Sequence, residues 1–374
     1  MSDLYLGMIS GTSIDGVDAV LVDFGDRSCR VIEAATTPFP PRLLARLRRI
    51  VEVPQTELRE LGALDHAVGT FFAGCALDLI ARAGVARDAV EAIGHHGQTI
   101  FHEPSGDEPF SMQIGDPNVV AATTGVCTVT DFRRLDMAVG GQGAPLVPAF
   151  HAWSFGVAHE ARAVVNIGGI ANITALQPNQ PTTGFDTGPG NTLLDLWVRR
   201  HRGADYDRDG QWSAGGNVDA ALLATLLTEP YFSATAPKST GRELFNMNWL
   251  DGHLSRHSAT ATAPADVQAT LAELTAATIV TSVDRTLRDC KRLIVCGGGA
   301  HNADLMARLR RLSGRSVDTT EAFGIAPDWV EGAAFAWLAR ARLHSEAGNV
   351  PTVTGARRLT VLGGVYLGSA PKHF

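Results

Sequence analysis

One pattern occurs twice in this chain and constrains its fold more than any other feature. An apolar strand runs into a glycine-rich turn, a second apolar strand follows, and a later strand ends in glycine. The first copy comprises residues 4–22 and 92–99, and the second comprises residues 163–176 and 292–299. Short apolar runs bounded by glycine and small polar residues are typical of β-strands. The repeat predicts two duplicated domains, although similar strands also arise by coincidence in α/β proteins.

Helical patterns fill the intervals between these strands. Apolar residues recur at helical spacing over residues 41–53, 58–83 and 264–287, and Pro264 and Pro327 stand where helices would begin. Strands that alternate with helices predict an α/β fold with parallel or mixed sheets. A chain of 374 residues exceeds what one core usually supports, so we expect two domains, residues 1–140 and 141–374.

Composition excludes several classes of protein. A net charge of −7 argues against a nucleic-acid partner, which would require a basic face. No uninterrupted apolar run approaches the roughly 18 residues of a membrane span, and the first residues lack the pattern of a signal peptide. We therefore expect no membrane partner and a cytoplasmic location. The five cysteines are scattered without a C-x-x-C pair, which favours neither a zinc site nor a disulfide framework.

The first glycine turn, residues 10–16, has the composition of a phosphate-binding loop. Glycine lets the backbone approach a ligand closely, and the hydroxyls of Thr12 and Ser13 can donate hydrogen bonds. Asp15 and Asp18 are placed to organise a hydrated cation or a reacting proton. We therefore predict phosphate contact at this turn, and the alternative is an ordinary polar hairpin turn.

Asp186 lies in a loop of glycines and a proline, residues 184–191, just before a predicted helix. Asn191 is better placed to cap that helix, which leaves Asp186 available for other work. A carboxylate in such a loop can take a proton from a hydroxyl or a water molecule. The alternative is a helix-entry turn in which Asp186 only bonds its own backbone.

Four further side chains are candidates for substrate contact. Arg133 could bind a carboxylate with two hydrogen bonds, or it could belong to a solvated charge cluster. His95 and His96 are neighbours on a strand and point to opposite faces, so a metal site is not favoured, and His96 and Gln98 are assigned to substrate hydrogen bonding. Glu331 is followed by small residues that would let a ligand approach, although acids in a first helical turn often only offset the helix dipole.

Two familiar nucleotide motifs are missing. The glycines at 297–299 lack the G-x-G-x-x-G spacing, and no G-x-x-x-x-G-K-[ST] occurs in the chain, so neither a Rossmann site nor a P-loop is supported. Three consecutive glycines still allow a flat base or a sugar to lie on the backbone.

A set of motifs in a fixed order covers nearly the whole chain and resembles the anhydro-N-acetylmuramic acid kinases. These motifs are residues 11–18, 96–99, 130–133, 140–148, 166–172, 184–191, 237–243 and 331–333. Each motif alone is weak, but together they are specific.

The resemblance implies two duplicated actin-like ATPase (ribonuclease H-like) domains around a central nucleotide cleft. It implies an ATP-dependent enzyme that opens the 1,6-anhydro ring of anhydro-N-acetylmuramic acid and phosphorylates O6. The products would be N-acetylmuramate 6-phosphate and ADP, in peptidoglycan recycling. It also implies that Mg²⁺ accompanies ATP, that Asp186 is the catalytic base and that the protein forms a homodimer.

The predicted site follows from the motifs and the resemblance together. The predicted ATP-binding residues are Gly11, Thr12, Ser13, Ile14, Asp15, Gly16, Val17, Asp18, Asn166, Gly168, Gly169, Gly297, Gly298 and Gly299. The predicted substrate-binding residues are His96, Gln98, Arg133 and Asp186. We assign Asp186 and Glu331 to catalysis, with Glu331 orienting the water or the sugar and Arg133 binding the lactyl carboxylate.

Three alternatives remain open. A related ATPase that works as a scaffold or polymer would share the glycine turns but would not need Asp186. A serine hydrolase using Ser13 would need the G-x-S-x-G elbow, which the sequence does not have. Another sugar kinase, acting on a free hydroxyl, is not excluded by the pattern.

Overall fold

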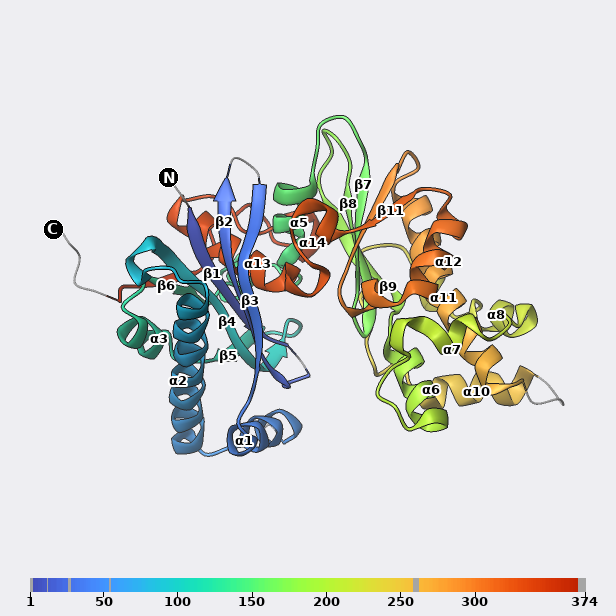
Figure 1. The fold of residues 1–374 in the computed structure, drawn as a ribbon, viewed down its shortest axis with the longest axis horizontal. Coiled ribbons are helices and arrows are strands. Elements are labelled where there is room, and N and C mark those ends of the chain that lie inside the picture. Colours follow the sequence, from blue (N-terminus) through green and yellow to red (C-terminus); the bar gives the residue numbers. More distant parts are fainter. Residues whose placement is uncertain (1–2, 12, 26–27, 54, 258–261, 369–374) are drawn as a thin grey trace. The chain divides into compact units, whose positions relative to one another are not determined.

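The computed structural model describes residues 3–11, 13–25, 28–53, 55–257 and 262–368. The chain divides into two compact units (Figure 1). Unit 1 comprises Met1–Ser154 and Trp329–Phe374, and unit 2 comprises Phe155–Asp328. The predicted boundary between residues 140 and 141 differs from this division. The difference arises because helix α13 (Val330–Leu343) packs against strands near the start of the chain, in unit 1.

The sheet of unit 1 has the order β12-β6-β4-β1-β2-β3, and β5 pairs with β4. Strands β1, β2 and β3 are joined antiparallel, whereas β4 runs parallel to β1 and β6 runs parallel to β4. The strands are β1 (Leu4–Ser10), β2 (Gly16–Gly25), β3 (Ser28–Pro38), β4 (Val90–Glu103), β5 (Phe110–Ile114), β6 (Thr128–Thr130) and β12 (Gly364–Tyr366).

The sheet of unit 2 repeats the central part of this arrangement. Its order is β11-β10-β7-β8-β9, with β7, β8 and β9 antiparallel and with β10 and β11 parallel to β7. The strands are β7 (Arg162–Ile167), β8 (Ile170–Leu176), β9 (Thr183–Pro189), β10 (Arg292–Cys296) and β11 (Ser316–Thr319). The order matches β6-β4-β1-β2-β3 strand for strand and direction for direction. The predicted duplication is therefore confirmed, and each unit has the actin-like topology.

The helices occupy the segments between these strands. In unit 1 they are α1 (Pro41–Glu52), α2 (Leu58–Arg82), α3 (Pro117–Thr124), α4 (Arg134–Ala138), α13 and α14 (Pro351–Thr354), and α5 (Val147–Phe155) ends at the first residue of unit 2. In unit 2 they are α6 (Thr192–Arg202), α7 (Gln211–Ala214), α8 (Ala220–Leu226), α9 (Pro230–Ser233), α10 (Met247–His257), α11 (Pro264–Thr286) and α12 (Ala303–Ser313). Short 3-10 turns are η1 (Arg87–Ala89), η2 (Arg208–Gly210), η3 (Gly298–His301), η4 (Thr320–Phe323) and η5 (Pro327–Trp329).

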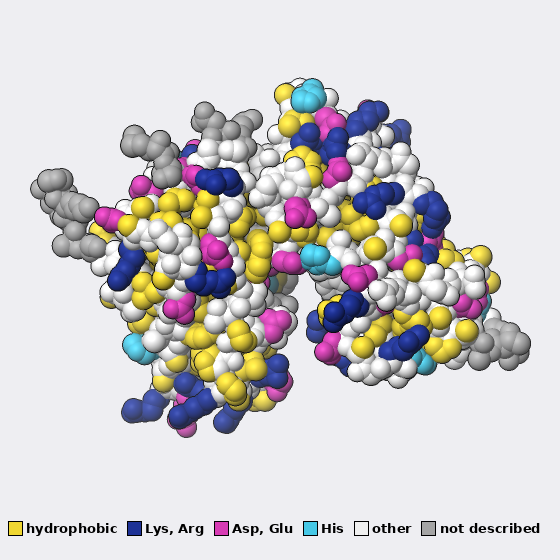
Figure 2. All heavy atoms as spheres, viewed as in Figure 1, with side chains coloured by type: hydrophobic (Ala, Val, Ile, Leu, Met, Phe, Trp, Pro, Cys, Tyr) yellow, Lys and Arg dark blue, Asp and Glu magenta, His cyan; other side chains and the backbone are white. Residues whose placement is uncertain are grey.

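Helix α1 shows why these segments are helical. Leu43, Leu47 and Ile50 recur at helical spacing and are buried, whereas the arginines between them face outward. Pro41 stands at the first helical position, where a missing N–H costs nothing. On the face shown in Figure 2, basic side chains gather at the α1 end of unit 1, while elsewhere basic and acidic side chains are interspersed.

Helix α2 is the one described helix that is long and apolar enough to cross a membrane, by length and composition alone. Half of its most apolar window is buried within the protein. Leu64, Val68 and Phe72 belong to the core cluster that also includes Leu6 and Met8 of β1. Uninterrupted apolar runs do not reveal this helix, because polar residues interrupt it.

Helix α13 covers the other face of the unit 1 sheet at unusually close range. A Cβ atom at Gly7 of β1 would overlap the carbonyl oxygen of Gly332, and one at Gly94 of β4 would overlap the carbonyl oxygen of Phe335. A Cβ at Gly332 would in turn overlap the side chain of Val20. The small residues after Glu331, which suggested ligand approach, are therefore used for helix–sheet packing.

Two apolar clusters lie among the described residues of unit 2. One lies between the sheet and helices α11 and α12, with Val165, Ile279 and Leu309 among its members. The other joins α6, α8, α10 and α11, and includes Leu193, Leu222 and Leu250. The second cluster supports the helical region that flanks the pocket described below.

Candidate active site

The first glycine turn connects β1 to β2 in unit 1. Ile14 adopts a left-handed conformation, with φ of 54°, and its N–H donates to the carbonyl of Gly11 at 3.2 Å. The Ser13 hydroxyl donates to Asp15 at 3.0 Å. Ile14 and Val17 are buried, so only their backbone groups are available to a ligand. Thr12 lies outside the described residues.

Gln98 supports this turn from the neighbouring strand β4. Its side-chain oxygen accepts a 2.6 Å hydrogen bond from the Ser10 hydroxyl. Its side-chain nitrogen donates to the carbonyls of Thr99 at 3.0 Å and Gly11 at 3.4 Å. Because Gln98 is only 1% exposed, this placement favours support of the turn over the predicted contact with substrate.

Two predicted substrate residues of unit 1 contact each other. Arg133 donates from Nε to Nε2 of His96 at 2.8 Å and from Nη1 to the carbonyl of Gly143 at 2.7 Å. Nδ1 of His96 donates to the carbonyl of Gly97, which fixes the tautomer. Burial and the charge of Arg133 hold the pKa of His96 well below its usual value. His96 is therefore a neutral acceptor that orients Arg133.

The prediction that His95 and His96 face opposite sides of the strand is confirmed. The His95 ring lies 5.5 Å from the ring of Phe72 on α2, whereas the His96 ring lies 4.9 Å from that of Phe335 on α13. Burial lowers the pKa of His95 to about 4, so this ring is neutral as well.

Glu331 is the second residue of α13 in unit 1. Burial raises the pKa of its carboxyl group, the charge of Asp18 raises it further, and Arg133 lowers it. Asp18 also accepts a 2.5 Å hydrogen bond from the Thr36 hydroxyl. Unit 1 therefore holds two mutually repelling carboxylates beside one arginine. Burial lowers the pKa of that arginine to about 10, which leaves it charged at neutral pH.

The second glycine turn connects β7 to β8 in unit 2. Its carbonyls are held by the segment that leads into α6: Gly190 and Thr192 donate to Gly169 at 2.9 and 3.1 Å, and Asn191 donates to Gly168 at 2.8 Å. The Asn191 side chain bonds the carbonyl of Ile167 rather than an N–H of α6. Asn191 therefore occupies the capping position of α6, as predicted, but its side chain does not form the capping hydrogen bond.

Asp186 lies on β9, and residues 231–240 form hydrogen bonds with both its side chain and its backbone. Its Oδ2 accepts a 3.1 Å hydrogen bond from the N–H of Thr240, and its own N–H donates to the carbonyl of Lys238 at 3.3 Å. The Tyr231 hydroxyl donates to the Asp186 carbonyl at 2.7 Å. Oδ1 has no hydrogen-bond partner among the described residues. The carboxylate is thus oriented from outside its own loop, with one oxygen free to accept a proton.

The environment of Asp186 sets its proton affinity. Burial raises the pKa of the carboxyl group, the Thr240 N–H and the charge of Lys238 lower it, and Glu243 raises it. The Lys238 ammonium is fixed near this strand, since it donates to the carbonyl of Tyr231 at 2.9 Å and lies 4.5 Å from the centre of that ring.

Replacement of Lys238 by methionine is therefore expected to move the acid limb of the pH profile to higher pH. A general base works only when deprotonated, and loss of the positive charge raises the pKa of Asp186. The kcat/KM of the reaction that the family resemblance implies should be measured from pH 4 to 8. Lys291→Met, an exposed lysine at the far end of β10, serves as the control. An acid limb that stays in place or moves down would contradict the assignment of Asp186.

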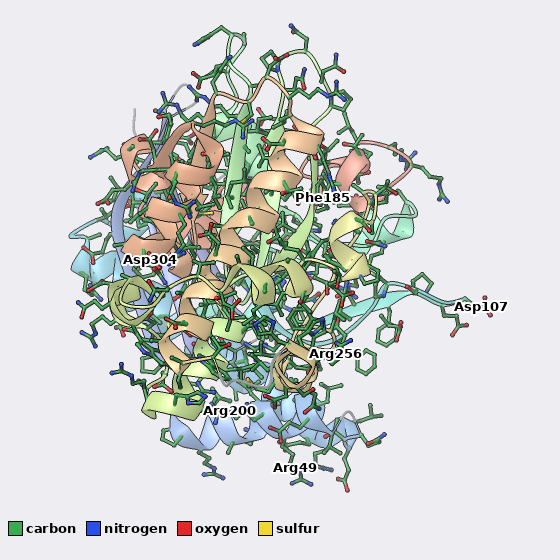
Figure 3. The ribbon with its side chains drawn as sticks, turned by 90° about the vertical axis from the view of Figure 1, so that its right-hand side faces the viewer. Arg49, Asp107, Phe185, Arg200, Arg256 and Asp304 are labelled. Carbon is green, nitrogen blue, oxygen red and sulfur yellow. The ribbon has the colours of Figure 1, made fainter. Side chains whose placement is uncertain are left out.

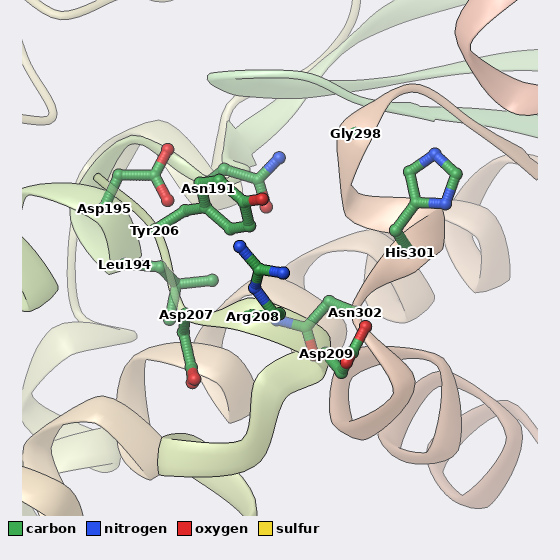
Figure 4. A pocket seen from close by; sticks show the side chains of 10 residues that line it. All are labelled: Asn191, Leu194, Asp195, Tyr206, Asp207, Arg208, Asp209, Gly298, His301 and Asn302. Carbon is green, nitrogen blue, oxygen red and sulfur yellow. The ribbon is translucent and has the colours of Figure 1, made fainter. Parts of the chain in front are cut away.

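The glycines at 297–299 follow β10. Gly297 has φ of 77°, and a Cβ there would overlap the side-chain oxygen of Asn166, while a Cβ at Gly299 would overlap Ile167. Gly298 instead faces a pocket of about 570 Å³ within unit 2. Figure 4 shows the side chains of Asn191, Tyr206 and Arg208 around this pocket. The remaining lining residues are Leu194, Asp195, Asp207, Asp209, His301 and Asn302.

The structure thus divides the predicted residues into two groups, each within one unit. In unit 1 the first turn, His96, Gln98, Arg133 and Glu331 lie around β1 and β4. In unit 2 the second turn, Asp186, Asn166 and residues 297–299 lie around β7, β9 and β10. Sequence reasoning missed Thr240 as the partner of Asp186, and it did not single out Tyr206 and Arg208, which line the pocket. The sequence signal for these two is weak, since it is only an aromatic residue two positions before an arginine.

Two units with one topology and glycine turns at equivalent positions define an actin-like fold. The family model described as anhydro-N-acetylmuramic acid kinase matches residues 3–368. Curated relatives with that name include one from Pasteurella multocida, 49% identical over 97% of this chain and 96% of its own length. Another, from Photobacterium profundum, is 50% identical over 97% of this chain and 98% of its own length.

This chain belongs to the anhydro-N-acetylmuramic acid kinase family. Among solved structures, a ROK family glucokinase from Streptomyces griseus in complex with glucose and AMPPNP aligns with 90% of this chain and 99% of its own. Its identity of 16% and TM-score of 0.40 are too low to add to the family assignment.

Proposed function

We propose that this protein uses ATP to phosphorylate 1,6-anhydro-N-acetylmuramic acid at O6 while water opens the anhydro ring, giving N-acetylmuramate 6-phosphate and ADP. Family membership supports the kinase reaction. The observation that carries the mechanism is the state of the Asp186 carboxylate, which has one oxygen fixed by the N–H of Thr240 and the other free.

Asp186 is the proposed general base for the attack of water. In the substrate, O6 is bonded to the anomeric carbon in the anhydro bridge, so there is no free hydroxyl at C6 to deprotonate. Water forms a bond to the anomeric carbon and loses one proton to Asp186 as the bond from that carbon to O6 breaks. The electron pair left on O6 forms the new bond to the γ-phosphorus, and ADP leaves.

The first glycine turn is proposed to contact the phosphates of ATP in unit 1. Phosphoryl transfer needs positioning and charge neutralisation more than covalent help. The backbone N–H groups of Gly11 and Ser13 are the proposed donors, while the Ser13 hydroxyl is used to hold Asp15 within the turn. The loss of one such preorganised donor typically costs about 3 kcal/mol, or a hundredfold or more in rate.

Mg²⁺ is expected to accompany ATP. The described residues contain no group of three or more metal-ligating side chains. That pattern fits Mg²⁺, which usually uses one or two carboxylates together with substrate phosphates and water. Asp15, whose carboxylate accepts a hydrogen bond from the Ser13 hydroxyl within the turn, and Asp18 would hold it. When bound, the ion neutralises charge on the phosphates.

Arg133 is proposed to bind the lactyl carboxylate of the sugar. Its Nε and Nη1 are occupied by His96 and Gly143, which fixes the plane of the guanidinium group and leaves Nη2 to reach a ligand. Glu331 retains its proposed role in orienting the water or the sugar. The homodimer belongs to this proposal and is supported by the family resemblance alone; light scattering after gel filtration measures it. The cytoplasmic location also belongs to this proposal and is supported by the composition of the sequence.

Turnover in ¹⁸O-water is expected to place the label on C1 of the product and none on phosphate. Attack of water at the anomeric carbon requires this outcome, because the phosphate receives its oxygen from O6. Mass spectrometry of the sugar phosphate and of phosphate locates the label. Unlabelled product incubated in ¹⁸O-water measures background exchange at C1. Label on phosphate would instead indicate plain ATP hydrolysis and would overturn the proposed mechanism.

A substrate panel tests the proposed function itself. ADP release should be followed with ATP, Mg²⁺ and a set of free and 1,6-anhydro sugars. The proposal requires release that depends on the anhydro amino sugar. Release with free sugars alone would identify a kinase for an ordinary hydroxyl, and release without any sugar would identify an ATPase.

A further inference from the structure

We propose that Arg242 and Thr192 complete an anion site at the Gly168–Gly169 turn, and that Arg242 is a catalytic residue that neutralises the phosphoryl group during its transfer. This inference rests on the proposed kinase function and adds two side chains to it.

The turn itself presents unused donors. The carbonyls of Gly168 and Gly169 are occupied by N–H groups of residues 190–192. The N–H groups of Gly168 and Gly169 donate to none of the described residues. Successive backbone N–H groups at a turn that lack internal partners form a concave site for anions. The turn therefore offers hydrogen-bond donors and has its carbonyl acceptors occupied, as expected of a phosphate-binding site.

Thr192 supplies a second, independent observation. Its side chain is only 7% exposed, and its hydroxyl has no hydrogen-bond partner in the described part of the chain. The hydroxyl oxygen lies 2.9 Å from the position that a Cβ of Gly169 would occupy. Buried polar groups are nearly always paired, so an unpaired hydroxyl at this point indicates a partner that binds there.

Arg242 brings a positive charge to the same point. Its Nη2 lies 3.9 Å from that Cβ position of Gly169. Arg242 is exposed, and among the described residues its guanidinium group forms no ion pair. Burial raises the pKa of the nearby Asp195 to about 6, and the charges of Arg199 and Arg242 lower it. An arginine without a fixed partner beside unused N–H donors is suited to an anionic ligand.

One loop carries Arg242 and also the N–H group that orients Asp186. Residues 237–243 provide the Thr240 N–H that orients Asp186 and also carry Arg242 to the glycine turn. During phosphoryl transfer, charge spreads over the equatorial oxygens of the transferred group, and an arginine that contacts them accelerates the reaction. The loop therefore places the proton acceptor and the charge-neutralising group in one arrangement.

Arg242→Gln is the test, with Arg242→Lys as the variant that retains the charge. We expect Arg242→Gln to lower kcat by about a hundredfold to a thousandfold, and Arg242→Lys to lower it by less. Arg256→Gln is the matched control, because Arg256 is an exposed arginine of the same unit whose Nε donates to the carbonyl of Gly252 on its own helix. In Figure 3, Arg256 lies well apart from Phe185, the chain neighbour of Asp186. The control should keep kcat within twofold.

Nucleotide affinity separates this inference from the proposed function. With Arg242→Gln, the affinity for a non-hydrolysable ATP analogue should fall about tenfold, whereas that for ADP, which lacks the γ-phosphate, should change less than twofold. Thr192→Val should weaken the analogue in the same selective way, and Thr192→Ser should restore it. Equal losses for ADP and the analogue, or a kcat within threefold of wild type, would overturn the inference. A wild-type protein without sugar-dependent turnover would instead refute the proposed function, while the affinity split would still decide the anion site.

Discussion

Asp186→Asn is expected to lower sugar-dependent ADP release by about a thousandfold while nucleotide affinity stays within twofold. General-base catalysis contributes roughly a hundredfold to ten-thousandfold, and asparagine cannot accept the proton. The substitution preserves shape, and the amide oxygen can still accept the hydrogen bond from the N–H of Thr240. Steady-state ADP release with the anhydro sugar and calorimetric titration of nucleotide would measure the two quantities.

The matched control for this experiment is Asp205→Asn. Asp205 lies in the same unit, its side chain is 87% exposed, and its ion pair is to Arg199 on the surface. Exposed pairs of this kind contribute little to stability, so activity should stay near wild type. If Asp186→Asn keeps activity within tenfold of wild type, Asp186 is not the base.

Gly7→Val is expected to destabilise unit 1 by about 4 kcal/mol or more and to lower the midpoint of thermal unfolding by about 10 °C or more. The valine side chain would have to occupy the volume of the Gly332 carbonyl and the backbone of α13. Backbone atoms cannot move aside as a flexible side chain can, and cores are packed too densely to absorb the difference. Circular dichroism during a thermal ramp would measure the effect.

Gly62→Ala provides the opposite case in the same unit. Gly62 lies in helix α2, is exposed, and has no neighbouring atom within 4 Å of the position of a Cβ. Alanine should therefore stabilise the protein by about 0.5–1 kcal/mol, since it reduces the freedom of the unfolded chain. A Gly7→Val protein that melts within 2 °C of wild type would show that α13 does not pack as described.

The parts of the fold that depend on local pattern could be predicted. The repeated strand–turn–strand pattern gave both hairpins, and helical spacing after Pro264 anticipated α11. The division of the chain could not be predicted in the same way. Residues 330–343 pack against β1 because Gly7 and Gly94 leave room for a helix backbone, and that relation spans more than 200 residues. No local periodicity records it.

The candidate site shows the same limit. Asp186 and the two glycine turns could be picked out because glycines around a polar group are unusual in a strand-rich segment. Their partners could not, because Thr240 reaches Asp186 across 54 residues and Gln98 turns inward to Ser10 and Gly11. A polar residue in a motif can contact a ligand or support the residue that does, and only its hydrogen bonds distinguish the two cases.

The interleaved layout of the chain has a consequence for its biosynthesis. Unit 2 is a continuous segment, whereas unit 1 is assembled from both ends of the polypeptide. During synthesis, the strands near the start of the chain therefore cannot be covered by α13 until residues 330–343 leave the ribosome. Until then, the sheet face that α13 covers in the folded protein remains exposed. Unit 2 can fold before those residues emerge, so we expect unit 2 to mature before unit 1, and we expect chaperones to bind nascent chains that stop before α13.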